Sequence, residues 1–140
     1  MATEYEFSAR LVFWGDLLDS KRLGNDLRLT VTQSRTKGEP LRLPDGTQSG
    51  SVAKTGTLSC ECSQDGSLRR EPEAQLLEIA GALRQLAGPV GKTYDVTEAQ
   101  LQLDVYYGKK ISGVPDFIFP SDLLDLLTLH RIALRITVLP

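Results

Sequence analysis

The residues best suited to chemistry are few and widely spaced. The chain has one histidine, His130, and two cysteines, Cys60 and Cys62. A catalytic histidine needs a nucleophile and an orienting carboxylate beside it, whereas His130 ends the last expected helix, where a solvated imidazolium is favoured by the helix dipole. The cysteines lack the further Cys or His ligands of a zinc site, and they alternate in phase with Leu58. We expect a surface cation and two small core residues.

The Gly91-Lys92-Thr93 segment ends like a phosphate-binding P-loop. That motif also needs glycine five residues before its second glycine, but this chain has Leu86 there, and a helix is expected to precede the segment where the motif requires a strand. We therefore interpret the segment as a loop that ends a helix.

Two carboxylate pairs are candidates for acid and base chemistry, Asp16 with Asp19 and Asp122 with Asp125. Such chemistry needs two carboxyl groups in unlike environments across a cleft. Both pairs instead stand where helices are expected to begin, and acidic residues are stabilising at helix N-termini for structural reasons. We interpret them as helix caps.

Charge and composition restrict the class of protein. The 140 residues include 16 Lys and Arg and 18 Asp and Glu, which gives a formal net charge of −2 and no strong attraction for nucleic acid or anionic lipid. No apolar stretch approaches the roughly 18 residues of a membrane span, and no signal peptide is recognisable. We expect a cytoplasmic single domain over residues 1–140 that needs no cofactor.

Elements that position these residues follow from hydrophobic periodicity. Alternation predicts strands, whereas apolar residues at helical spacing, with caps and prolines, predict helices. The polar segment at about 32–56 is predicted to be a hairpin or loop insert. Strands are predicted over residues 5–14, 57–63, 101–107 and 132–138, and helices over residues 20–27 and 71–86 and from residue 120.

Each predicted strand has one apolar and one polar side, so one face of the sheet is expected to contact solvent. Such strands are typical of antiparallel sheets covered by helices on one face. We predict an α+β fold with a mostly antiparallel sheet of four to five strands and about three helices on one face. The element order suits a ferredoxin-like fold or an elaboration of one.

The solvated face and one aromatic loop are the candidate binding surfaces, because aromatic and arginine side chains anchor protein interfaces. Two alternatives stay open: the insert could half cover Trp14 and Tyr106, and Phe117 could simply pack beneath the last helix. The candidate partner-binding residues are Arg10, Trp14, Glu61, Asp104, Tyr106, Tyr107, Lys109, Asp116, Phe117 and Arg135.

A resemblance to a known family covers nearly the whole chain. The segments that carry it are Phe13-Trp14-Gly15-Asp16-Leu17-Leu18-Asp19, Leu29-Thr30-Val31-Thr32, Lys37-Gly38-Glu39 and Ser51-Val52-Ala53-Lys54-Thr55-Gly56. They resemble the small bacterial family described as domain of unknown function 4279. The chain departs from the family's pattern at Val31-Thr32 and Thr57-Leu58. The family has no agreed catalytic residues, so the resemblance implies none here.

The resemblance implies a function in protein binding, since small acidic bacterial domains without catalytic residues are often immunity proteins. We expect a non-enzymatic domain that binds and blocks a cognate bacterial toxin. Two alternatives remain. One is a regulatory or structural domain that forms a homodimer through an edge strand such as the closing one. The other is a small-ligand protein with a pocket between its helices and insert.

Overall fold

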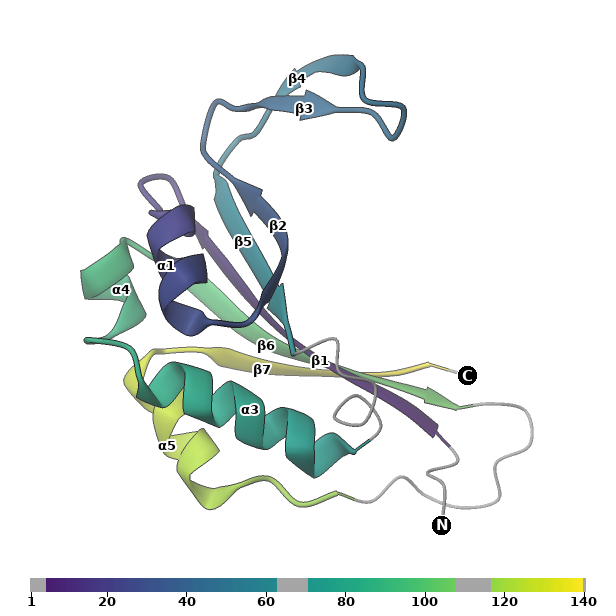
Figure 1. Ribbon diagram of the computed structural model, residues 1–140, viewed down its shortest axis with the longest axis vertical. Helices are drawn as coiled ribbons and strands as arrows, with labels where there is room; N and C mark the ends of the chain where they lie inside the picture. The colour runs from purple at the N-terminus through teal and green to yellow at the C-terminus, as the bar shows by residue number, and fades with distance from the viewer. Residues whose placement is uncertain (1–4, 63–70, 108–116, 140) are drawn as a thin grey trace.

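A long central strand, β1 (Tyr5–Gly15), organises the main sheet. The computed structural model describes residues 5–62, 71–107 and 117–139 (Figure 1). Five strands form the sheet in the order β2-β5-β1-β6-β7. The other members are β2 (Thr30–Arg35), β5 (Gly56–Glu61), β6 (Glu98–Tyr107) and β7 (Ala133–Leu139).

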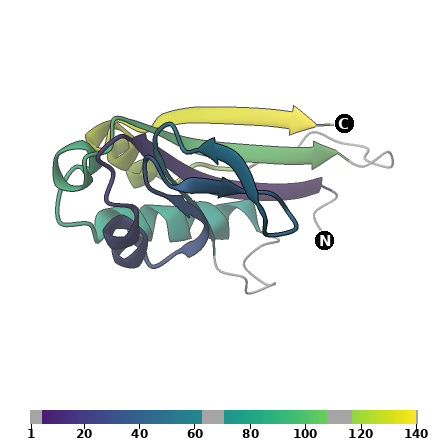
Figure 2. The same ribbon diagram turned by 90° about the horizontal axis from the view of Figure 1, so that it is seen from above.

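The helices cover only one face of this sheet (Figure 2). Their starts agree with the sequence signals: Asp19 accepts a hydrogen bond from the Arg22 backbone N–H at 3.3 Å, and Pro72 occupies the first turn of its helix, where a missing N–H costs nothing. The three longer helices are α1 (Ser20–Leu27), α3 (Pro72–Arg84) and α5 (Ser121–Leu129), and α4 (Val90–Tyr94) is a single short turn.

The topology is a pair of split βαβ units. In the first, α1 joins β1 to β2, and β5 lies between these two strands; in the second, α3 and α4 join β5 to β6, and β1 lies between them. All neighbours within these units are antiparallel, and β7 is added in parallel to β6 after α5. The predicted α+β class, with a mostly antiparallel sheet and helices on one face, is confirmed.

The core lies between the helices and the inner face of the sheet. Phe13 on β1, Leu58 on β5 and Leu101 on β6 are fully buried there. Cys60 and Cys62 are also buried on this side, which confirms the interpretation that they are small core residues. Burial raises the pKa of the Cys60 thiol to about 12, so it stays protonated and unreactive near neutral pH.

Among the described residues, no strand pairs with one end of β1 on the β5 side. β5 ends at Glu61, the partner of Arg10, whereas β1 extends back to Tyr5. The buried side chain of Gln75 on α3 occupies the gap: its Oε1 accepts from the Ala9 N–H at 3.1 Å, and its Nε2 donates to the Phe7 carbonyl at 2.9 Å. A helix amide thereby satisfies two backbone groups that a strand would otherwise pair.

The polar insert is a β-hairpin arm, made of β3 (Pro40–Arg42) and β4 (Gln48–Val52), which form a separate two-stranded sheet. The arm projects from the end of the main sheet (Figure 1). The insert is shorter than the predicted span of residues 32–56, because β2 and the start of β5 belong to the main sheet. At its base, Lys37 pairs with Asp16 at 3.0 Å.

The closing strand departs from the expected burial. Its apolar residues Leu134, Ile136 and Val138 face the helix side, in register with buried residues of β6, yet they are 41%, 53% and 58% exposed. The physical reason is position: β7 forms the sheet edge, and α3 packs over β1 while α1 packs over β5 and β2.

Candidate functional site

The face of the sheet opposite the helices carries the side chains that were predicted to contact solvent, and we call it the open face. It has a polar row that crosses all five strands. Each member is the Cα partner of the next: Thr30 on β2, Glu61 on β5, Arg10 on β1, Gln102 on β6 and Arg135 on β7. Three predicted partner-binding residues therefore lie in one line.

Arg10 is the centre of this row. Its Nη2 donates a hydrogen bond to Gln102 Oε1 at 2.8 Å, and Gln102 Nε2 donates to Gln100 Oε1 at 3.1 Å. The Arg10 Nε is buried and has no hydrogen-bond partner among the described residues. One amide thus holds part of the guanidinium, and the other terminal N–H groups keep donor capacity for an incoming acceptor.

Trp14 and Tyr106 lie on the open face but at opposite ends of it. Tyr106 is 42% exposed and pairs with Glu6, whereas Trp14 is partly buried and stands eight residues further along β1. Eight residues of strand span about 26 Å. The two aromatic side chains therefore bracket the polar row and do not form one cluster.

The remaining predicted residues do not lie together. Asp104 lies on the open face beside Ser8. Phe117 lies on the helix side, where its ring meets Phe7 edge to face with the centroids 5.1 Å apart; this agrees with the alternative that it packs beneath the last helix. The backbone of Tyr107 pairs with Tyr5 at the end of the sheet. Lys109 and Asp116 lie outside the described residues.

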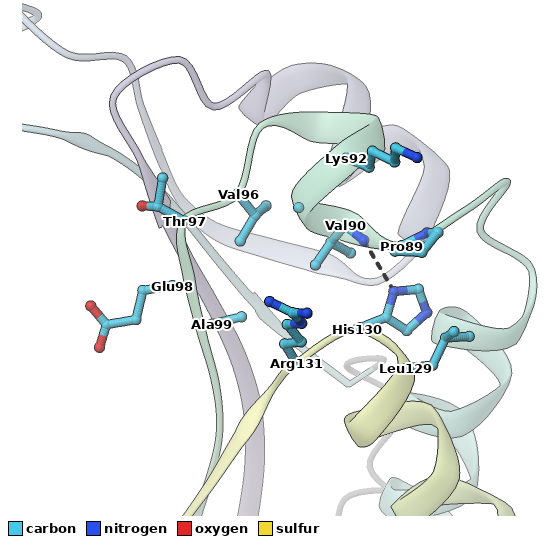
Figure 3. Close-up of a pocket in the computed structure, with 11 residues that line it drawn as sticks. Pro89, Val90, Lys92, Val96, Thr97, Glu98, Ala99, Leu129, His130 and Arg131 are labelled. Atoms are coloured by element: carbon cyan, nitrogen blue, oxygen red, sulfur yellow. Dashed lines mark hydrogen bonds between the residues drawn. The ribbon is translucent and has the colours of Figure 1, made fainter.

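A pocket of about 540 Å³ lies at one end of the fold, between α4, the start of β6 and the end of α5. Val90, Val96 and Ala99 supply apolar walls, and Lys92 and Arg131 supply cations (Figure 3). Sequence analysis did not predict this pocket, because its lining comes from three segments that only the fold brings together. The interpretation of Gly91-Lys92-Thr93 as a loop was also wrong, because these residues belong to α4.

His130 lies in the wall of this pocket and is only 4% exposed, so its interpretation as a solvated cation was wrong. Its Nδ1 accepts a hydrogen bond from the Val90 N–H at 3.2 Å, which leaves the proton of the neutral ring on Nε2. Burial lowers the pKa of His130, and a hydrogen bond with the Leu83 backbone opposes that shift. The imidazole satisfies an N–H at the start of α4, a group that a helix cannot pair internally.

These contacts give His130 a structural role. Its hydrogen bonds tie the end of α5 to α4 and α3, and the carboxylate of Glu98, the acidic residue that lines the pocket, points away from the imidazole (Figure 3). A general base needs a free nitrogen within reach of the substrate. The hydrogen bonds of His130 leave no such nitrogen in this arrangement.

The interpretation of the four carboxylates as helix caps is correct only for Asp19, because Asp16 precedes α1 by four residues and α5 has no side-chain cap. Asp19 caps α1 and Asp16 pairs with Lys37, whose hydrogen bond holds the pKa of that carboxyl below its usual value. Asp122, in the first turn of α5, pairs with Arg84 of α3. Over residues 5–62, 71–107 and 117–139, no three His, Cys, Asp or Glu side chains gather in a way that could hold a metal ion.

Comparisons of the chain with family models, curated proteins and solved structures found no match. Within the described ranges, no helix is both long and apolar enough to cross a membrane.

Proposed function

We propose that this chain is a non-enzymatic domain that binds a partner protein through the open face of its sheet. The observation that carries this proposal is the uninterrupted row from Thr30 to Arg135, which crosses five strands on a face that none of the described helices covers. The backbone of a hydrogen-bonded sheet is already ordered, so it loses little conformational entropy on binding.

The chemistry of the open face suits a protein more than a polyanion. Arg10 and Arg135 alternate with amides and with acidic residues such as Glu61 and Asp104, so neither sign of charge dominates. Protein interfaces combine charge pairs of both signs with arginine and aromatic anchors. The partly buried Trp14 and the exposed Tyr106 supply the aromatic anchors at the two ends.

We further propose that the partner is a bacterial toxin and that the chain acts in the cytoplasm as its immunity protein. This finer proposal depends on the resemblance to the domain of unknown function 4279 family. If the toxin is a basic enzyme such as a nuclease, the carboxylates of Glu61 and Asp104 would mimic its anionic substrate and speed association.

The test is growth rescue. The product of the gene next to the one that encodes this chain is expressed with and without this chain. Binding is then measured between this chain and that product, each purified. We expect this chain to restore growth, Trp14→Ala and Tyr106→Ala each to weaken binding by about 10-fold or more, and Leu77→Ala to have no effect. Leu77 is a matched control, because it is 58% exposed on α3, in the helix layer.

Two outcomes would count against the proposal. A neighbouring product that is harmless and does not bind would reject the immunity role. Binding that is unchanged in both open-face variants but reduced in Leu77→Ala would move the interface to the helix layer.

A further inference from the structure

The two edges of the main sheet are built differently. β2, at one edge, has a register irregularity between Val31 and Gln33, and bulges are a common device that protects an edge from pairing with another chain. β7, at the other edge, pairs with β6 in unbroken register over seven residues and contains neither proline nor lysine. In the described parts of the chain, no strand pairs with the outer side of β7.

The apolar side chains of β7 lie on the helix side of the sheet, next to the core, but they are largely exposed. Leu134, Ile136 and Val138 are in register with Leu101, Leu103 and Val105 of β6. The β6 residues are no more than 2% exposed, whereas each β7 residue is at least 41% exposed. A further strand can add to a sheet edge that has unpaired backbone groups and an apolar row of side chains. The main-chain hydrogen bonds then supply affinity, and the alternate side chains supply specificity.

We propose that β7 pairs with β7 of a second copy of this chain, antiparallel and centred on Ile136. In this register Ile136 lies opposite Ile136 of the second copy, and Leu134 lies opposite Val138 of the second copy. Directly opposed residues share a face, so the apolar rows of both copies meet on the helix side. This assembly goes beyond the proposed function, and it would join the two open faces into one continuous sheet.

Charge selects this register over its neighbours. Centring the pair on Arg135 would place two guanidinium groups directly opposite each other, which is destabilising. Centring it on Ile136 places Arg135 opposite Thr137 of the second copy, and Thr137 is the partner of Asp104 within its own copy. Two strand spacings separate Arg135 from that Asp104, about 10 Å between backbones, a gap that an arginine and an aspartate side chain together can span.

The remaining register lacks this pairing. Centring on Thr137 would place Arg135 opposite Leu139 of the second copy, in the row of Tyr106 and Glu6. The Glu6 carboxylate would then be three strand spacings away, about 14 Å between backbones. The Ile136 register is therefore the one in which both arginines gain an acidic neighbour, and the symmetry of a twofold dimer forms the ion pair twice.

Sedimentation over a concentration series tests the assembly. We expect the unaltered chain to move from monomer to dimer as concentration rises, and Ile136→Lys to weaken the dimer about 100-fold or more, because like charges would meet on the axis. Val52→Lys is the matched control, since Val52 is a 55% exposed strand residue on the arm, and it should leave the dimer intact. Circular dichroism verifies that each variant is folded.

Charge reversal and cross-linking test the register. Arg135→Asp and Asp104→Arg should each weaken the dimer, and the double variant should restore it. Ile136→Cys should form an intermolecular disulfide on oxidation, because opposed Cα atoms lie about 4.5 to 5.5 Å apart. Val138→Cys should not, because the two copies of that residue would be about 14 Å apart.

Three results would overturn the proposal. A chain that stays monomeric at every concentration rejects self-association. A dimer that is insensitive to Ile136→Lys assigns the interface to another surface. A monomer whose capture of the toxin is lost in Ile136→Lys but kept in Val52→Lys assigns β7 to a different protein. The growth-rescue test uses the unaltered chain and open-face variants, so failure of the dimer and failure of the proposed function are distinguishable.

Discussion

His130 shows how one buried side chain can order several elements. It ends α5, accepts the Val90 N–H at the start of α4 and contacts the Leu83 backbone on α3. These segments form the end of the fold where the pocket lies. Since the neutral form of the ring makes the contact with Val90, protonation of Nδ1 would break it.

Stability should therefore fall on mild acidification. The pKa of His130 is lowered in the folded protein, chiefly by burial, so the unfolded chain binds a proton that the native chain resists. The His130 contribution is then fully present above about pH 6.5, the unfolded value, and is lost as pH falls toward the folded pKa. The free energy of unfolding should decrease by at most about 1.4 kcal/mol per pH unit in this window.

His130→Asn isolates this effect, because its Oδ1 can accept from the Val90 N–H but cannot titrate. Urea unfolding between pH 5 and 7 should show a slope with pH for the unaltered chain and a flatter profile for the variant. Asp16 and Asp45 have lowered pKa values, so they contribute below this window. Equal slopes in the two proteins would show that another group carries the pH dependence.

Residue environments were predictable where the signal was local. The alternation of Cys60 and Cys62 with Leu58 predicted their burial, and the position of Asp19 predicted its cap. The roles of His130 and Gln75 were not predictable, because their partners lie 40 and 66 to 68 residues away in the chain. Only the packed fold brings such groups within hydrogen-bond distance.

At the scale of elements, the arm is the least integrated part of the described structure. The residues of β4 are all exposed, and the arm's contacts with itself include the Ala53 N–H to Glu39 carbonyl bond at 2.9 Å. No residue from 40 to 52 belongs to the core, whereas Ala53 at its base is buried. The arm should therefore add little to the free energy of unfolding.

Replacement of residues 40–52 by Asn-Gly tests this expectation, because that dipeptide closes a two-residue hairpin between Glu39 and Ala53. We expect cooperative thermal unfolding with a midpoint within about 4 °C of the original, equivalent to less than 1 kcal/mol. Loss of a cooperative transition would mean that the arm supports the body. The same variant in the binding assay separates a role of the arm from one of the open face.

Elements with strong periodicity were predicted well, and elements defined by tertiary contacts were not. β1, α1 and α3 begin within about one residue of the predicted positions. Most of β2 was assigned to the insert because residues 32–35 are polar, and it becomes a strand through its pairing with β5. The exposure of β7 depends on where the helices end over the sheet, which periodicity cannot reveal.

At the scale of the whole molecule, stability and recognition are divided between the two faces of one sheet. The helix side contains the large buried side chains, and the open face contains the polar row centred on Arg10. The phase of the strands fixed this division, and the sequence therefore predicted the open-face positions of Arg10, Glu61 and Arg135. Their alignment in a single row required the strand order and register.

This division predicts a gradient of local stability, which amide hydrogen exchange measures. β1 is paired on both sides over residues 10–14 and borders the core, so the amides of this stretch should exchange only on global unfolding. The amides of β3 and β4 pair only within the arm and should exchange at least about 100-fold faster. Equal protection of β1 and the arm would contradict the gradient, because it would require the arm to unfold with the core.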